Sequence, residues 1–122
     1  MPYVKNFFCC GMQDHKWSPD LLYDCIWLQW FLMYLTDDDL VEQLTKCKEH
    51  LTINPETQMS GFIIIKENIC ERGTSRDDED NSVIRTVQMF NDIFDKVGLM
   101  ILHTSRQPGW SKDLFPVQLW VL

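Results

Sequence analysis

Two kinds of polar side chain in this sequence have types and spacing that could bind a small ligand. The run Asp-Asp-Glu-Asp occupies residues 77–80, and Gln29 and Asn68 stand at the ends of two apolar runs. Carboxylates gathered in one place attract a protonated amine, such as a lysine or a free N-terminus. A buried amide is costly unless it is hydrogen-bonded, so Gln29 and Asn68 are candidates for ligand contacts. The predicted chemistry is recognition of a cation.

Each candidate also has an ordinary structural explanation, and the sequence leaves both open. The acidic run could begin a helix capped by Asn81 or Ser82, because carboxylates favour helix N-termini. The two amides could instead be satisfied by backbone groups. Trp30 could attract a cation with its ring face or pack in the core, and Tyr34 could simply be a packing residue.

Composition limits the class of protein and its partners. A chain of 122 residues with 45% hydrophobic residues predicts one domain with its own core. The net charge of -7 argues against a nucleic-acid partner and favours a basic one. No apolar run approaches the ~20 residues of a bilayer span, and no secretory signal is evident, so we expect no membrane insertion.

The cysteines point to a reducing compartment. Five cysteines form an odd set without C-x-x-C spacing, which predicts buried, reduced thiols and no metal site. We therefore expect a soluble protein of the cytoplasm, the nucleus or both.

Apolar periodicity predicts alternating strands and helices in the first half of the chain. A buried strand is expected at 3–10, and another, covered on both faces, at 24–31. Thr36 and Asp39 form a variant capping box that starts a helix at about 37–51. A third strand begins at Gly61 and ends at 66–68.

The second half is predicted to add a helix and a closing hairpin. Residues 69–81 read as a polar loop. One helix face is then marked by Val83, Val87, Phe90, Phe94 and Val97, with Gly98 as the left-handed terminator. Strands at 99–102 and 115–122 follow, joined by a turn at Pro108-Gly109. These elements predict an α/β sheet with parallel members that closes in an antiparallel hairpin.

This arrangement brings the candidate residues to one edge of the sheet. Open α/β sheets bind ligands beyond the carboxyl ends of their strands. Met12 and Gln13 follow the first predicted strand, Gln29 and Trp30 end the second, and Asn68 ends the third.

Five sequence blocks resemble a specific family. Among them are Ile-Trp-Leu-Gln-Trp, ending at Trp30, and Ile-Lys-Glu-Asn, ending at Asn68, in this order and ahead of the spaced acids. The chain is similar to the C-terminal half of the protein α-N-terminal methyltransferases that modify chains beginning X-Pro-Lys. The matching blocks are 6–14, 23–30, 35–37, 61–68 and 77–82.

The resemblance implies a cofactor, S-adenosylmethionine, and a set of residues around it. Met12 and Gln13 would approach its adenine side, and Gln29 would lie near its methionine portion. The implied fold class is α/β, a partial Rossmann-like S-adenosylmethionine-dependent methyltransferase fold that lacks the first two strands. Residues 1–122 would be the C-terminal portion of a single methyltransferase domain.

The resemblance also implies a peptide site for an X-Pro-Lys N-terminus. Trp30, Tyr34, Asp77 and Ser82 would bind the peptide, with Asp77 and Asp80 receiving the lysine. Asn68 would orient the amine, and Asp80 would position or deprotonate it.

Tyr34 departs from the family pattern, in which a histidine implicated as a base usually stands at this position. Methyl transfer needs a neutral amine, and an N-terminal ammonium has a pKa near 8, against about 4 for a carboxyl. Proton transfer from that ammonium to Asp80 is therefore uphill by roughly 5 kcal/mol unless burial raises the acid's pKa. Release of the proton to water before binding is the alternative.

The family's glycine-rich cofactor loop and its ribose-binding acid have no counterpart in this sequence. The family places the strands that carry them between the strands ending at Cys10 and Trp30, so an open sheet edge is expected. We expect an incompletely predicted gene, an expressed fragment, or a chain that needs a second copy or a partner. Weak or absent cofactor binding by this chain follows.

Two functions are consistent with these observations. The first is methylation of X-Pro-Lys N-termini by the full-length parent protein. The second is a catalytically silent interaction module that recognises basic N-termini or pairs with an active paralogue.

Overall fold

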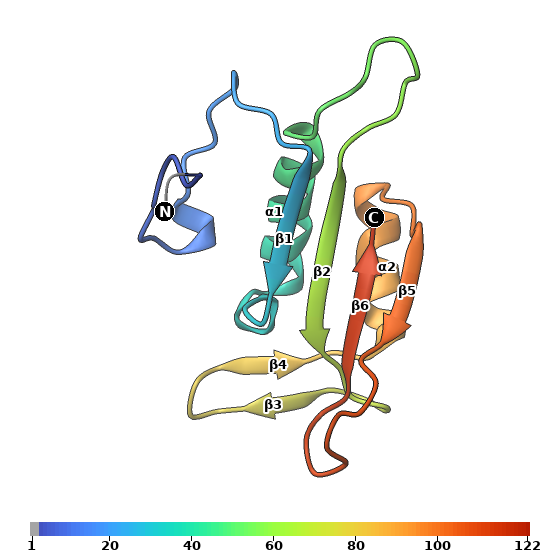
Figure 1. The fold of residues 1–122 in the computed structure, drawn as a ribbon. Helices are drawn as coiled ribbons and strands as arrows, with labels where there is room; N and C mark the ends of the chain where they lie inside the picture. Colours follow the sequence, from blue (N-terminus) through green and yellow to red (C-terminus); the bar gives the residue numbers. More distant parts are fainter. Residues whose placement is uncertain (1–2) are drawn as a thin grey trace.

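Two α-helices pack on one face of a four-stranded sheet in the computed structural model, which describes residues 3–122 (Figure 1). A small hairpin lies beyond the ends of the first two strands. The sheet contains β1 (Cys25–Gln29), β2 (Phe62–Asn68), β5 (His103–Arg106) and β6 (Val117–Val121). The remaining elements are η1 (Met12–Asp14), η2 (Leu32–Tyr34), α1 (Asp37–Glu49), α2 (Val87–Val97), and β3 (Ser75–Asp77) with β4 (Ser82–Ile84) in the hairpin.

The strand order β1-β2-β6-β5 confirms the predicted class of sheet. β1 pairs parallel with β2, with Cys25 opposite Phe62 and Gln29 opposite Lys66. β6 pairs antiparallel with both β2 and β5. The chain therefore has a parallel pair at one side and an antiparallel hairpin at the other.

Capping residues set the ends of both helices. The Asp39 N–H donates to Thr36 Oγ1 at 3.1 Å, and the Thr36 hydroxyl donates to Asp39 Oδ2 at 2.9 Å, as the variant capping box predicts. Gly98 ends α2 in the left-handed conformation, with φ of 75°. The predicted start of that helix is wrong, because Thr86 is its N-cap and Val83 lies in β4.

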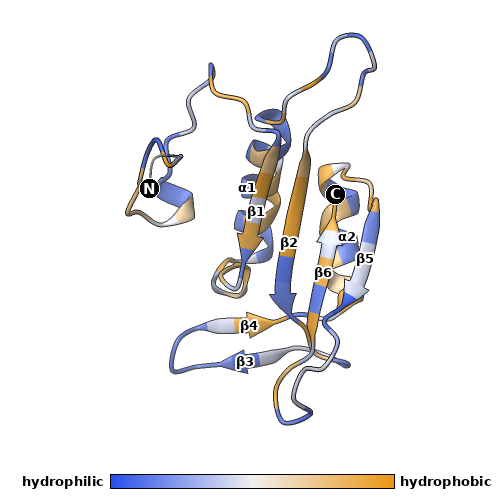
Figure 2. Cartoon of the chain, viewed as in Figure 1, coloured by the Kyte–Doolittle hydropathy of each residue, from blue (hydrophilic) through white to orange (hydrophobic). Residues whose placement is uncertain are grey.

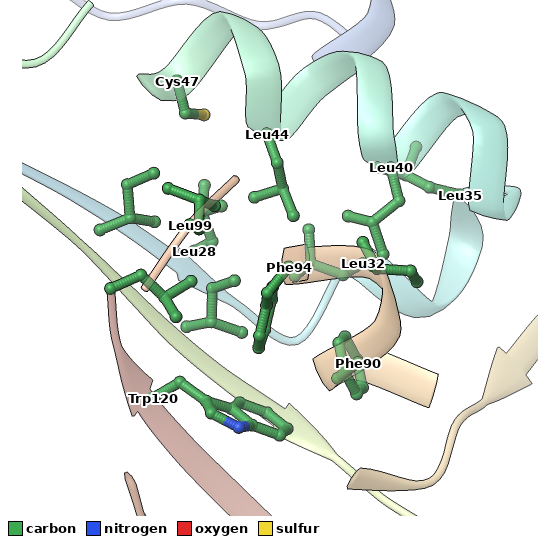
Figure 3. Packing of buried hydrophobic residues seen from close by; sticks show 14 of the residues in the cluster. Leu28, Leu32, Leu35, Leu40, Leu44, Cys47, Phe90, Phe94, Leu99 and Trp120 are labelled. Atoms are coloured by element: carbon green, nitrogen blue, oxygen red, sulfur yellow. The ribbon is translucent and has the colours of Figure 1, made fainter. Parts of the chain in front are cut away.

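The core fills the space between the sheet and the two helices (Figure 3). Trp120 of β6 is fully buried, with its ring 4.8 Å from Phe90 and 5.6 Å from Phe94, both on α2. Leu40 and Leu44 of α1 complete the layer over β1 and β2. None of the helices in residues 3–122 has the length and apolar character to cross a bilayer.

Two strand predictions at the N-terminal side are wrong. Residues 3–10 form no strand and are exposed, because no described strand lies beside them to accept their backbone hydrogen bonds. β1 is covered on one face only: Leu28 is buried, whereas Trp27 is 54% exposed. Both helices lie on the Leu28 side, and Figure 2 shows the hydrophobic character of β1 and of much of β2.

Three further predictions are corrected in the second half of the chain. Residues 99–102 are not a strand, since the Leu99 N–H closes α2 by donating to the Phe94 oxygen at 2.9 Å and the strand starts at His103. The stretch predicted as a polar loop contains β3 and the turn that leads to β4, so the acidic run lies at the end of β3 and in this turn rather than at a helix start.

The prediction of buried cysteines holds for two of the five. Cys47 and Cys70 are buried, whereas Cys9, Cys10 and Cys25 are exposed. Cys9 and Cys10 belong to the exposed N-terminal segment, and Cys25 lies on the face of β1 that no layer of the described chain covers.

Candidate functional site

The carboxyl ends of β1 and β2 place Trp30 and Asn68 at the same edge of the sheet. The Trp30 N–H donates to the Lys66 oxygen at 3.1 Å and so extends the parallel ladder by one residue. The backbone then turns sharply, because Trp30 has φ of 55°. No hydrogen bond within residues 3–122 engages the Asn68 side-chain amide, which leaves it available to a ligand.

Tyr34, Asp80 and Ser82 form a small polar cluster at this edge. Asp80 Oδ1 accepts from the Ser82 N–H at 2.9 Å, and Ser82 itself is buried. Hydrogen bonds from the hydroxyl and backbone of Ser82, with a smaller contribution from the Tyr34 hydroxyl, lower the pKa of Asp80. Asp80 is exposed, so it lacks the burial that would raise its pKa and make it a stronger base.

Asp77 has a different role in the described structure. Its Oδ1 accepts from the Glu79 N–H at 2.9 Å, which stabilises the hairpin turn. The neighbouring Asp78 pairs with Arg76 at 2.9 Å. Within residues 3–122 no hydrogen bond or ion pair joins Asp77 to Trp30, Asn68 or Asp80. The tertiary structure thus gathers one of the two predicted acids into the cluster with Tyr34.

Trp30 lies in an aromatic pair rather than in the core. It is 41% exposed, and its ring centroid is 6.2 Å from that of Trp110, which follows β5 in the chain. Lys66 Nζ lies 5.5 Å from the centroid of the Trp30 ring, so a cation of the protein already occupies this ring. Sequence reasoning missed Trp110, because it stands in an irregular stretch without periodicity.

A cavity of about 690 Å³ lies beside the cluster and is lined by two of the three predicted cofactor residues, Met12 and Gln13. Trp27, Phe31 and Tyr34 line it from β1 and the segment that follows. Gln29 is not part of the lining, and its Oε1 accepts from Trp27 Nε1 at 2.9 Å. Its amide is therefore engaged by a side chain rather than by the backbone.

The lining of this cavity fits part of S-adenosylmethionine. Its aromatic and thioether side chains and the Gln13 amide suit a flat base that needs a few hydrogen bonds. It contains no Asp, Glu, Lys or Arg that could pair with the ribose or with the charged amino acid portion. The residues present thus fit the adenine side of the cofactor, where Met12 and Gln13 are expected.

Two buried charged residues, Glu67 and Arg85, lie directly beneath this edge, and sequence reasoning did not identify them. Arg85 is 2% exposed and Glu67 is 1% exposed. Burial raises the pKa of Glu67, although hydrogen bonds from the backbone N–H groups of Asn68 and Leu32 and the charge of Arg85 oppose the increase. Eighteen positions separate the two residues in the chain, so no local pattern joins them.

The whole length of the chain, residues 1–122, matches the family model of the AdoMet-dependent proline di-methyltransferases. The chain belongs to this family. It is 37% identical over 119 residues to N-terminal Xaa-Pro-Lys N-methyltransferase 1 of Danio rerio, and 40% identical over 119 residues to alpha N-terminal protein methyltransferase 1 of Dictyostelium discoideum. These alignments cover 98% of the chain, but 50% of the first relative and 41% of the second.

A solved structure agrees with this family assignment. A SAM-dependent methyltransferase from Leishmania major superposes with a TM-score of 0.79 and 32% identity, over 92% of the chain and 42% of that protein. The mitomycin 7-O-methyltransferase MmcR superposes with a TM-score of 0.63 at 14% identity, which shows the shared fold alone. The chain therefore has a partial methyltransferase fold and spans about half the length of the relatives it matches.

Proposed function

We propose that this chain forms part of an S-adenosylmethionine-dependent methyltransferase that modifies the α-amino group of protein N-termini beginning X-Pro-Lys. One observation carries the proposal: Tyr34 lines the same cavity as Met12 and Gln13, and its hydroxyl lies close enough to Asp80 to help lower the pKa of that acid. The predicted cofactor cavity and the predicted amine-binding acid therefore meet at one side chain. Transfer of a methyl group requires this proximity between donor and acceptor.

The low pKa of Asp80 gives it the role of a counter-ion. A carboxylate that accepts a hydrogen bond from the Ser82 N–H and has a lowered pKa is a weak base, so it remains charged and can serve the peptide lysine. We therefore assign release of the ammonium proton to water before binding, after which Asn68 and Asp80 orient the neutral amine. Bound S-adenosylmethionine would supply an electrophilic methyl carbon to the amine lone pair and leave as S-adenosylhomocysteine.

The free edge of β1 supports a proposal about partners. The Phe62 N–H donates to the Asp24 oxygen, and the Trp30 N–H donates to the Lys66 oxygen. The backbone N–H and C=O groups of the even-numbered residues of β1 therefore face β2. The backbone groups of Cys25, Trp27 and Gln29 consequently point away from β2, with no described strand beside them. We propose that a second copy of the chain can pair at this edge.

The proposed amine site is tested by peptide binding to the 122-residue chain. An X-Pro-Lys peptide should bind more tightly than its N-acetylated copy, and Asp80→Asn should weaken the unmodified peptide several-fold because the counter-ion is lost. Asp78→Asn is the matched control, since Asp78 pairs with Arg76. If calorimetry gives equal peptide affinities for Asp80→Asn and the unsubstituted chain, the acidic run serves only the hairpin turn.

The alternative, a catalytically silent module for basic N-termini, uses the same cluster. The absence of Asp, Glu, Lys and Arg from the cavity lining favours it, because tight cofactor binding by this chain is not expected. Mass spectrometry of the peptide after incubation with S-adenosylmethionine and the full-length parent protein separates the two. A mass gain at the α-amine selects the methyltransferase, and an unmodified but bound peptide selects the silent module.

A further inference from the structure

We propose that Glu67 and Arg85 act together as a buried positioning pair that fixes the three segments carrying the predicted acceptor residues. These segments are the end of β2, the turn around η2 and the β3–β4 hairpin. The inference rests on the proposed function and extends it to two residues that do not themselves contact the peptide.

Arg85 joins the hairpin to the segment around η2 through every part of its guanidinium. Its Nη1 donates to the Leu32 oxygen at 3.2 Å, and its Nη2 donates to the Leu35 oxygen at 2.6 Å. Its Nε donates to Asp37 Oδ1 at 2.7 Å, at the start of α1. Backbone bonds hold Arg85 itself beside the residues after β2, since the Cys70 N–H donates to its oxygen at 3.0 Å.

Glu67 joins the same turn to β2. Its Oε2 accepts from the Leu32 N–H at 3.1 Å, and its Oε1 accepts from the Asn68 N–H at 2.9 Å. Leu32 therefore gives its N–H to Glu67 and its oxygen to Arg85. This fully buried leucine is the point at which the three segments meet.

Four of the predicted acceptor residues lie within three positions of these contacts. Asn68 follows Glu67 directly, Leu32 lies between Trp30 and Tyr34, and Ser82 stands three residues before Arg85. The hydrogen bond from the Ser82 N–H to Asp80 Oδ1 links Asp80 to the same contacts. A shift of one segment would separate Tyr34 from Asp80, and small misplacements of reacting groups are costly for transfer.

The charges themselves indicate positioning rather than stability alone. Burying charged side chains carries a desolvation penalty, and well-packed apolar residues often stabilise a core equally well. An apolar pair could not donate to two carbonyl groups and accept from two N–H groups at fixed angles. The forked geometry of arginine suits this task, whereas lysine offers a single point charge.

The test compares Arg85→Lys and Glu67→Gln with Arg106→Lys, whose ion pair with Glu71 lies on the surface. Each variant is first shown to be folded by its unfolding curve, and Glu67→Gln is the milder change should Arg85→Lys fail to fold. We then measure affinity for an X-Pro-Lys peptide and hydrogen exchange at individual amides. We expect Arg85→Lys to lose about tenfold in affinity, because one segment is released.

Hydrogen exchange supplies the readout that a purely structural role would not move. The amides of Leu32 and Ser82 should exchange faster in both core variants, whereas the Leu44 amide within α1 should keep its rate. Arg106→Lys should change none of these. Equal acceleration of all three amides, or unchanged exchange and affinity, would overturn the inference.

The same data distinguish failure of the proposed function. If the unsubstituted chain binds the peptide no better than its acetylated copy, the proposed amine site fails. Selectively faster exchange of the Leu32 and Ser82 amides in the core variants would still support the positioning pair. Unchanged exchange at these amides would still reject the positioning pair.

Discussion

The two faces of the sheet are built from the same strands but have different surroundings. On the helix side, Leu28, Ile63 and Trp120 are at most 5% exposed. On the opposite side, Trp27 is 54% exposed and Phe62 is 39% exposed. Alternation along a strand decides which side a residue takes, whereas a covering layer decides whether that side is buried.

This difference is unusual for a parallel pair of strands. Parallel sheets are normally covered on both faces, and β1 and β2 have helices on one face in the described chain. The uncovered apolar side chains lie next to the free backbone groups of β1. Additional protein surface packed against the N-terminal side of this fold would therefore be stabilising.

The largest difference between the faces should appear in stability. Trp120→Ala removes a fully buried ring and should lower the free energy of unfolding by about 3 to 5 kcal/mol. Trp27→Ala removes an exposed ring and should change it by less than about 0.5 kcal/mol. Urea unfolding followed by circular dichroism measures both, and similar losses would show that the open face is covered in solution.

Thiol reactivity should follow the same division. Burial raises the pKa of Cys47, on α1, to about 12, so its reactive thiolate is scarce at pH 8. Cys25 is exposed on the edge strand. Alkylation with iodoacetamide under native conditions, followed by peptide mapping, should label Cys25 at least tenfold faster. Comparable rates would contradict the burial of Cys47.

The smallest expected effect concerns association at the open edge. Trp27→Lys places a charge beside the free backbone groups of β1, and edge charges discourage strand pairing. Sedimentation velocity across a concentration series should show several-fold weaker self-association than in the unsubstituted chain. Phe115→Lys is the control, because Phe115 is exposed away from β1. A monomer at every concentration in the unsubstituted chain would reject pairing between copies.

Short-range patterns predicted much of the fold. The capping of α1 by Thr36, the end of α2 at Gly98 and the parallel pairing of two apolar runs are confirmed. The β3–β4 hairpin was missed because its strands have three residues each, too few to show a period. The strand predicted at 3–10 was wrong because apolar residues form a strand only where a neighbour accepts their hydrogen bonds.

The candidate site was predicted in part. The family resemblance pointed to Tyr34, Asp80 and Ser82; in the structure the Ser82 N–H donates to Asp80, and the Tyr34 hydroxyl contributes to the low pKa of that acid. The resemblance also placed Gln29 near the cofactor and Asp77 beside Asp80, whereas Gln29 accepts a hydrogen bond from Trp27 and Asp77 accepts one from Glu79 in the turn. Arg85 and Trp110 carried no signal, because their partners stand far away in the chain.

The amino-acid sequence by itself determined the helices, the direction of the strands and the edge of the sheet at which polar residues collect. These features depend on periodicity and capping within a few residues of one another. Only the tertiary structure decided which face of the sheet is covered and which backbone groups the buried charges contact. Burial, and the contacts that Glu67 and Arg85 each make with Leu32, depend on groups that folding brings together from distant positions, so no local pattern encodes them.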